Sequence, residues 1–239
     1  MFVGADGCKA GWFTVILMEN NDWKVCLFPD VFSLWNKCSS ASVILLDVPI
    51  GLREKGSEER LCDIEARKLL GPKRRSSVFP APCRSSLSAV TYEEASRINK
   101  QMTGRLLSLQ TWNIIPKIRE ADALLSNDRS ARSRIREIHP EICFWALSGH
   151  PMEHSKKKRE GLLERTQVLR SSYPQTEDIM KYALSRYRRR RNKVARDDIL
   201  DALSAAVTTT AGVEKLVSIS KIPEFDSQGL RMEIVYHRV

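Results

Sequence analysis

The first fifty residues read as four strands, and the difference between the fourth strand and the first three restricts the fold. Residues 2–6, 13–18 and 23–28 are short segments rich in β-branched and apolar residues, which predicts an antiparallel meander. Residues 42–46 form an apolar run, as expected of a parallel strand that is buried on both faces. Together they predict an α/β fold, a mixed sheet with helices on both faces.

Most of the remaining chain has helical patterns, and two further segments read as strands. Residues 135–139 predict a fifth strand, and "LRMEIVYHRV" predicts a last one. No repeat or low-complexity linker divides the chain, so we expect a single domain over residues 1–239 with a helical insertion at 52–130. Helical patterns cover residues 31–38, 57–70, 92–102, 112–125 and most of the chain from the fifth strand to Lys215.

Acidic residues stand where several of these elements end or begin. Asp6 ends the first predicted strand, Asp47 ends the fourth and Glu141 follows the fifth. Asp198 and Asp201 lie near the start of the apolar helix "DDILDALSAAV", three residues apart, so both can face one point. Carboxylates that converge beyond the ends of parallel strands repel one another unless a hard cation neutralises them. This predicts Mg²⁺ or Mn²⁺ held by Asp6, Asp47, Glu141 and Asp198, with Asp201 as a further catalytic candidate.

Ions held in this way can activate water and stabilise a leaving oxygen in phosphodiester hydrolysis. Each acid also has an ordinary structural role open to it: Asp6 and Asp47 suit turns and strand ends, and Asp198 suits a helix N-terminus. Asp201 lies one turn inside an apolar helix, where these explanations fit less well. The combination, rather than any one acid, predicts the metal site.

The net charge of +10, from 39 basic and 29 acidic residues, is typical of a protein with a polyanionic partner such as nucleic acid. The basic excess is concentrated in residues 73–75, 156–159 and 186–193. The last run contains Arg188, Arg189 and Arg190, which we expect to contact phosphates, although such runs also occur as solvated basic faces. The sequence has no apparent membrane span or secretory signal, and its six cysteines include no C-x-x-C pair, so we expect a cytoplasmic protein with free thiols.

Six motifs, in this order along the chain, resemble the family called domain of unknown function 429: "GADGCKAGW", "DVPIGL", "RLCDIEARKLLG", "SSVFPAP", "EIHPEICF" and "DDILDALSAA". That family is described as predicted nucleases with a ribonuclease H-like fold, so the resemblance implies three antiparallel strands followed by parallel strands, and a metal-dependent nuclease. Asp6 resembles the metal-binding aspartate of the first strand in that fold, and Asp47 resembles the acid that ends its fourth strand. Asp198 and Asp201 have the spacing seen in the last helix of Holliday junction resolvases.

Other residues of these motifs are candidates for supporting the metal ligands or contacting substrate. In "EIHPEICF", Glu137 and His139 lie toward one face if the predicted strand stays regular. Arg60, Asp63 and Arg67 lie on one face of a predicted helix, where they can bind a phosphate or form ion pairs within the helix.

Two other functions stay open at this point. Sugar kinases and actin-like ATPases share the ribonuclease H-like fold, but such a phosphotransferase needs a second glycine-rich phosphate loop, and the glycines of the later chain stand singly. A non-catalytic module that binds nucleic acid or protein would keep the fold while its acids bind no metal. Loss of Mn²⁺ binding on substitution of Asp6 or Asp47 separates an enzyme from such a module.

Overall fold

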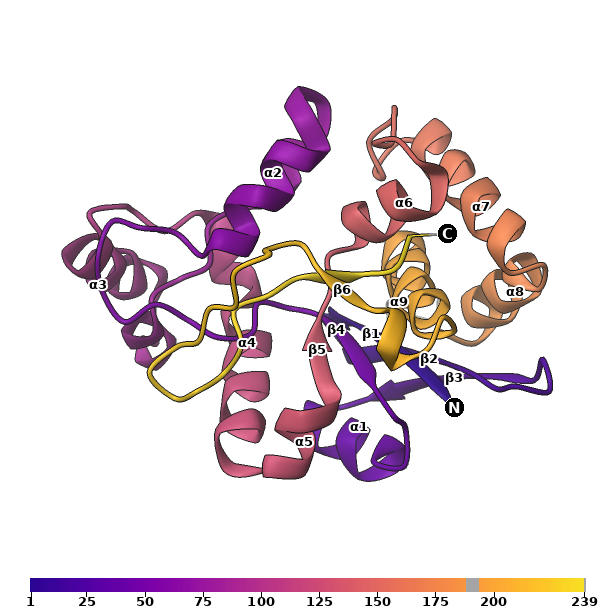
Figure 1. Cartoon of the computed structure of the whole chain (residues 1–239), viewed down its shortest axis with the longest axis horizontal. Helices are drawn as coiled ribbons and strands as arrows, with labels where there is room; N and C mark the ends of the chain where they lie inside the picture. Colours follow the sequence, from indigo (N-terminus) through magenta and orange to yellow (C-terminus); the bar gives the residue numbers. More distant parts are fainter. Residues whose placement is uncertain (188–193, 239) are drawn as a thin grey trace.

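The computed structural model of the chain describes residues 1–187 and 194–238, and its centre is a five-stranded mixed sheet (Figure 1). Strands β1 (Phe2–Cys8), β2 (Gly11–Leu17) and β3 (Trp23–Phe28) form antiparallel pairs. Strands β4 (Ile44–Asp47) and β5 (Ile135–Glu137) continue the sheet in parallel from β1, which gives the order β3-β2-β1-β4-β5. The predicted mixed sheet is confirmed, and it is consistent with a ribonuclease H-like α/β fold.

The helices fall into three groups along the chain. Helix α1 (Val31–Cys38) lies between β3 and β4. The second group, between β4 and β5, comprises α2 (Leu61–Arg74), the 3₁₀ turns η1 (Arg75–Ser77) and η2 (Arg84–Ser88), α3 (Tyr92–Thr103), α4 (Leu109–Asn127) and α5 (Arg129–Arg134). The third group follows β5 and comprises α6 (Pro140–Ser148), α7 (Arg159–Ser172), α8 (Thr176–Tyr187), α9 (Arg196–Thr209) and the 3₁₀ turn η3 (Val213–Lys215). None of the described helices is long and apolar enough to cross a membrane.

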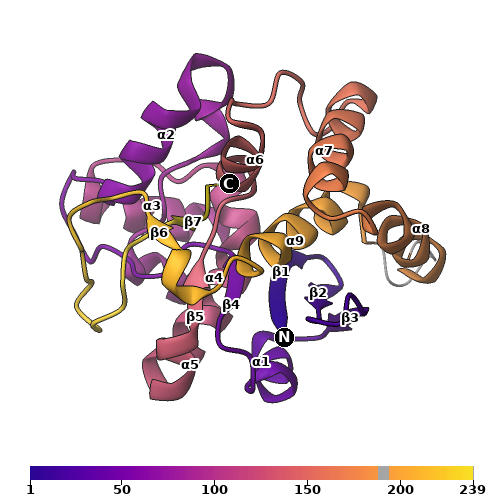
Figure 2. The ribbon, with the colours of Figure 1, turned by 45° about the vertical axis from the view of Figure 1, so that its right-hand side comes forward.

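Helices pack on both faces of the sheet, as the apolar fourth strand predicts. Helices α1 and α4 cover one face, where Leu34 and Ile118 share a buried cluster with Ala5 and Leu46. Helix α9 covers the other face and lies against β1, β2 and β4, with α6, α7 and α8 packed around it (Figure 2). Alternate side chains of β1 and β4 therefore face α4 on one side and α9 on the other.

One glycine lets α9 approach β1 closely. A Cβ atom on Gly4 would lie 2.1 Å from the backbone nitrogen of Ala206 and 2.5 Å from the carbonyl oxygen of Ala202, so no other residue fits there. The helix presents small buried residues at these positions. Because Asp201 immediately precedes Ala202, the same contact brings its carboxylate beside β1.

Several predicted boundaries differ from the structure, most of them by a few residues. Strand β1 continues past Asp6 to Cys8, because the turn to β2 is tighter than predicted and Cys8 pairs with Gly11. Strand β5 ends at Glu137 rather than at residue 139, because Pro140 begins α6, where its fixed φ suits the first helical turn. In the described part of the C-terminal segment, the strand β7 (Val235–Tyr236) is short and pairs with β6 (Val217–Ser218) in a separate two-stranded sheet.

Candidate metal centre

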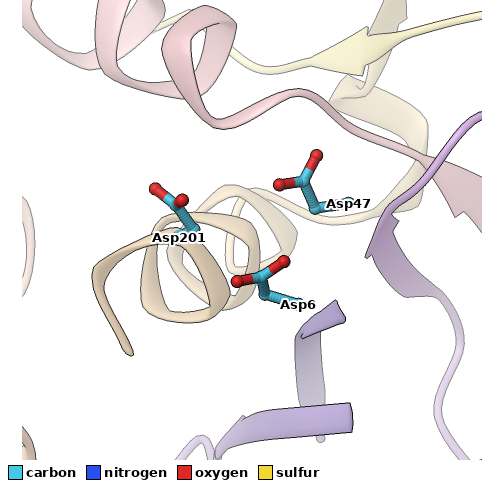
Figure 3. A group of neighbouring side chains, drawn as sticks. All are labelled: Asp6, Asp47 and Asp201. Carbon is cyan, nitrogen blue, oxygen red and sulfur yellow. The ribbon is translucent and has the colours of Figure 1, made fainter. Parts of the chain in front are cut away.

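Strand register brings two carboxylates together at the end of β4. Asp6 of β1 is the parallel partner of Asp47, the last residue of β4, so the two side chains lie on the same face of the sheet. Asp201 of α9 comes from the helix that covers this face, and Figure 3 shows the three carboxylates directed toward one space. One oxygen from each lies within 4.8 Å of the other two. We call these three residues the acidic centre.

The acidic centre is poorly solvated, and its members repel one another. Asp6 and Asp201 are only 8% and 1% exposed, and Asp47 is partly buried. Burial, followed by the charges of Asp47 and Asp201, raises the pKa of Asp6 well above its usual range. Burial and the charge of Asp201 raise the pKa of Asp47 to about 8, and burial also raises the pKa of Asp201. Such carboxylates ionise together only when a cation offsets their charge.

One oxygen of the acidic centre has no donor. Oδ1 of Asp201 is buried and accepts no hydrogen bond from the described residues. The other oxygen, Oδ2, accepts a hydrogen bond from Nζ of Lys156 at 2.5 Å. A buried carboxylate oxygen without a partner costs free energy, and coordination of a cation by the three acids would satisfy it. The residues present therefore fit a hard divalent cation.

Lys156 brings a positive charge to the acidic centre from the loop between α6 and α7. Burial alone would lower the pKa of Lys156, but the charges of Asp201, Asp47 and Asp6 outweigh burial and raise it. The Lys156 side chain is 36% exposed, so it reaches the acids from the protein surface. When the three acids are ionised, Lys156 offsets one of their three negative charges, and within residues 1–187 and 194–238 no other ion pair offsets the rest.

Two other predicted ligands lie near the acidic centre but outside it. Oδ2 of Asp198 accepts a hydrogen bond from the backbone nitrogen of Ala195 at 2.8 Å, as in a helix cap, and burial raises the pKa of Asp198 to about 6. Glu141, in the first turn of α6, forms a buried ion pair with Arg165 of α7, which leaves Oε2 of Glu141 without a donor among the described residues. Asp201 is thus the third acid brought to Asp6 and Asp47, and metal ligation by Asp198 and Glu141 stays a prediction.

Two other buried carboxylates, Asp63 of α2 and Glu137 of β5, are bridged by one arginine, which donates a hydrogen bond to every one of their oxygens. Nε and Nη2 of Arg60 donate to the two oxygens of Asp63 at 3.0 and 2.6 Å, and Nη1 and Nη2 donate to those of Glu137 at 2.7 and 2.8 Å. Nη1 also donates to the carbonyl oxygen of Ile50 at 3.1 Å. All five N–H donors of Arg60 are therefore used, and none is left for a phosphate. We call Arg60, Asp63 and Glu137 the arginine triad.

Glu137 and His139 do not lie as the sequence predicts, because β5 ends at Glu137. Glu137 is the parallel strand partner of Leu46, so the two side chains share a face of the sheet. Asp47, the next residue of β4, lies on the opposite face. His139 follows the end of the strand, where its Nε2 lies 3.3 Å from the carbonyl oxygen of Ser77, and burial lowers its pKa. The alternation predicted for residues 137, 139 and 141 does not occur, because the chain enters α6 at Pro140.

The acidic centre adjoins a cleft of about 550 Å³. Its walls carry the predicted residues Asp6, Asp47, Asp198, Glu141, Glu137, His139, Arg60 and Asp63, together with Lys117, Lys156 and Lys157. A second hollow of about 600 Å³ shares Ser76, Val78 and Phe79 of its wall with this cleft and carries Arg67, Lys68 and Arg75. Arg67 also pairs with Glu59. Arg188, Arg189 and Arg190 lie outside the described residues, so their contact with nucleic acid stays a prediction.

A family model covers the part of the chain that builds this site. The model, described as protein of unknown function (DUF429), matches residues 4–221. The chain belongs to this family. No curated protein and no solved structure matches the chain. In this DUF429 member the matched span includes the acidic centre, Lys156 and the arginine triad.

The sequence of this DUF429 member does not single out Lys156 or Arg165. Lys156 belongs to the basic run 156–159, which reads equally well as a solvated face. Arg165 is wholly buried in α7, although an arginine in a polar helix usually points to solvent. The contacts of Lys156 and Arg165 depend on where the α6–α7 loop lies in the fold. Local sequence spacing does not predict the position of that loop.

Proposed function

We propose that this DUF429 member is a nuclease that hydrolyses phosphodiester bonds in nucleic acid with Mg²⁺ or Mn²⁺ bound at the acidic centre. The observation that carries the proposal is the convergence of Asp6, Asp47 and Asp201, with a buried oxygen of Asp201 that has no donor in the part of the chain that the structure describes. Carboxylate oxygens are the ligands that these ions prefer. A bound ion of this kind acidifies a coordinated water and offsets the charge of a phosphodiester under attack.

The residues of the chain have separable tasks in this proposal. Asp6, Asp47 and Asp201 bind the ion, and they come from two paired strands and a closely packed helix, so they need little rearrangement to do so. Asp198 lies on the cleft wall, and Oδ2 is used as a helix cap. Its other oxygen, Oδ1, accepts the proton of the attacking water, and a pKa raised to about 6 suits a base near neutral pH.

Basic and aromatic side chains along the cleft support nucleic acid as the substrate class. Lys157 is an exposed residue of the cleft wall, and Lys68 and Arg75 are exposed residues around the adjoining hollow. Phe79 lines both spaces, where a base can stack on its ring. Phosphate contacts from such side chains release counterions, so we expect the affinity for nucleic acid to fall steeply as salt rises.

Cleavage of a labelled panel tests the proposal. The panel contains single-stranded and duplex DNA, RNA, an RNA/DNA hybrid and a four-way junction, each with Mg²⁺ or Mn²⁺. We expect the wild type to cleave at least one of them and Asp6→Asn to lose about a thousandfold in rate, because it removes a metal ligand. The matched control is Asp178→Asn, an exposed aspartate in the first turn of α8, which should keep full activity.

Two results would contradict the proposal. Equal cleavage by the wild type and Asp6→Asn would exclude the acidic centre as the source of activity. Binding of nucleic acid without cleavage and without Mn²⁺ binding would favour the non-catalytic module.

A further inference from the structure

The loop that carries Lys156 is fixed in place from several directions. The Glu164 carboxylate accepts hydrogen bonds from the backbone nitrogens of Glu153 and His154 at 2.7 and 2.9 Å. Arg74, at the end of α2, donates to the carbonyl oxygens of Met152 and Glu153, both at 2.7 Å. The loop is therefore held at both α2 and α7, and its position does not depend on the lysine.

Arg165 ties the same loop to Glu141. Its Nη1 donates to the carbonyl oxygens of His154 at 2.9 Å and Gly161 at 3.0 Å, and its Nη2 pairs with Oε1 of Glu141. Arg165 is fully buried, with its guanidinium 5.5 Å from the ring centre of Phe144. A buried guanidinium needs an anionic partner, so Glu141 fixes Arg165, and Arg165 fixes the backbone two residues before Lys156.

The charges of the acidic centre can then be counted. When an ion is bound and all three carboxylates are ionised, they carry three negative charges, and the ammonium of Lys156, 2.5 Å from Oδ2 of Asp201, supplies one positive charge. The two charges left over are those that one divalent ion neutralises. The count covers the three converging acids; Asp198 is outside that group and caps α9 at the positive end of the helix dipole, which offsets part of its charge.

We propose that Lys156 is a built-in cation of the acidic centre, which limits the centre to one divalent ion, and that the Glu141–Arg165 pair is the positioning device that places it. The inference rests on the metal site of the proposed function and adds the number of ions and the role of three residues. It gives Glu141 a different task from the metal ligation that its sequence motif predicts. Glu141 acts through Arg165 and the loop.

Mn²⁺ titration by calorimetry tests the role of Lys156. The wild type should bind one ion per chain, and Lys156→Met should bind Mn²⁺ at least about tenfold more tightly, because a competing positive charge is gone. Lys158→Met is the matched control, since it removes an exposed charge from the same basic run at a position outside the cleft wall. Its Mn²⁺ affinity should equal that of the wild type.

The results separate this inference from the proposed function. Unchanged or weaker Mn²⁺ binding in Lys156→Met, or two ions per wild-type chain, would overturn the inference and leave the metal site standing. Absence of Mn²⁺ binding in both the wild type and Lys156→Met would remove the metal site itself, and the inference with it.

A double-mutant cycle tests the role of Glu141. Glu141→Gln should loosen the loop and tighten Mn²⁺ binding, by less than Lys156→Met does, and it should add nothing when Lys156 is already Met. Weaker Mn²⁺ binding with Glu141→Gln in both backgrounds would make Glu141 a ligand and overturn its positioning role. Glu164→Gln loosens the same loop from outside the buried pair, so it gives the same test if Glu141→Gln does not fold.

Discussion

The acidic centre and the arginine triad are both groups of buried carboxylates beside one cleft, but among the described residues hydrogen-bond donors balance all the carboxylate oxygens only in the triad. In the triad, two carboxylates face one guanidinium whose five N–H donors are all used. In the acidic centre, three carboxylates face one ammonium, and an oxygen of Asp201 has no donor among the described residues. Folding alone does not favour such an arrangement, so the unbalanced group is the one that indicates a ligand.

Replacing Arg60 by Met breaks the balanced group and should have the largest effect on stability. The change leaves Asp63 and Glu137 buried without their partner, so we expect a loss of about 3–5 kcal/mol in the free energy of unfolding. Urea denaturation measures it, and Mn²⁺ should not restore the loss. Lys68→Met removes an exposed ion pair with Glu65 on the same helix and should cost less than about 1 kcal/mol. Similar stabilities for the two variants would show that the triad does not hold the fold.

Replacing Asp47 by Asn relieves the unbalanced group and should act in the opposite direction. The folded pKa of about 8 lies above the ordinary value of 3.8, so the folded chain keeps a proton that the unfolded chain releases. The stability of the metal-free wild type therefore falls as pH rises from about 4 to about 8. Asp47→Asn lacks this titration and should be more stable than the wild type by on the order of a few kcal/mol at pH 8, and equal to it near pH 4.

Thermal unfolding in a chelator, followed across this pH range, measures the difference for Asp47→Asn. Added Mn²⁺ should raise the unfolding temperature of the wild type at pH 8 and leave that of the variant unchanged, because a ligand stabilises only the chain that binds it. Parallel pH profiles for the two proteins would mean that Asp47 has an ordinary pKa. The contrast between the two groups would then be lost.

Two of the three residues of the acidic centre can be predicted because strand patterns determine them. Asp6 and Asp47 follow apolar strand residues, and parallel neighbours in register share a face of the sheet. The choice between Asp198 and Asp201 cannot be predicted in this way, since both lie near one face of the same helix. It depends on how far α9 sits along β1, and the contact at Gly4 fixes that.

Long-range contacts decide the remaining parts of both groups. Helical spacing predicts that Arg60 and Asp63 meet, but their third partner, Glu137, lies 77 residues from Arg60 on another element. Lys156 likewise reaches Asp201 across 45 residues from a loop. Spacing within an element is visible in a sequence, whereas the placement of a loop against a sheet follows from packing of the whole domain. In each group, the member that comes from a distant element, Glu137 in the triad and Lys156 at the acidic centre, was therefore the hardest to predict.

Replacing Glu137 by Gln should have the smallest effect and separates the two groups most sharply. The amide keeps the shape of the carboxylate and can still accept from Arg60 and from the backbone nitrogen of Ile50, so we expect a loss of about 1 kcal/mol in the free energy of unfolding. Glu137 lies on the opposite face of the sheet from Asp47, so the Mn²⁺ affinity of the Glu137→Gln variant should differ from that of the wild type by less than about twofold. Calorimetry on Glu137→Gln beside Asp47→Asn, which should bind no Mn²⁺, makes the comparison. A tenfold weaker affinity in Glu137→Gln would place Glu137 among the ligands and make the two groups one site.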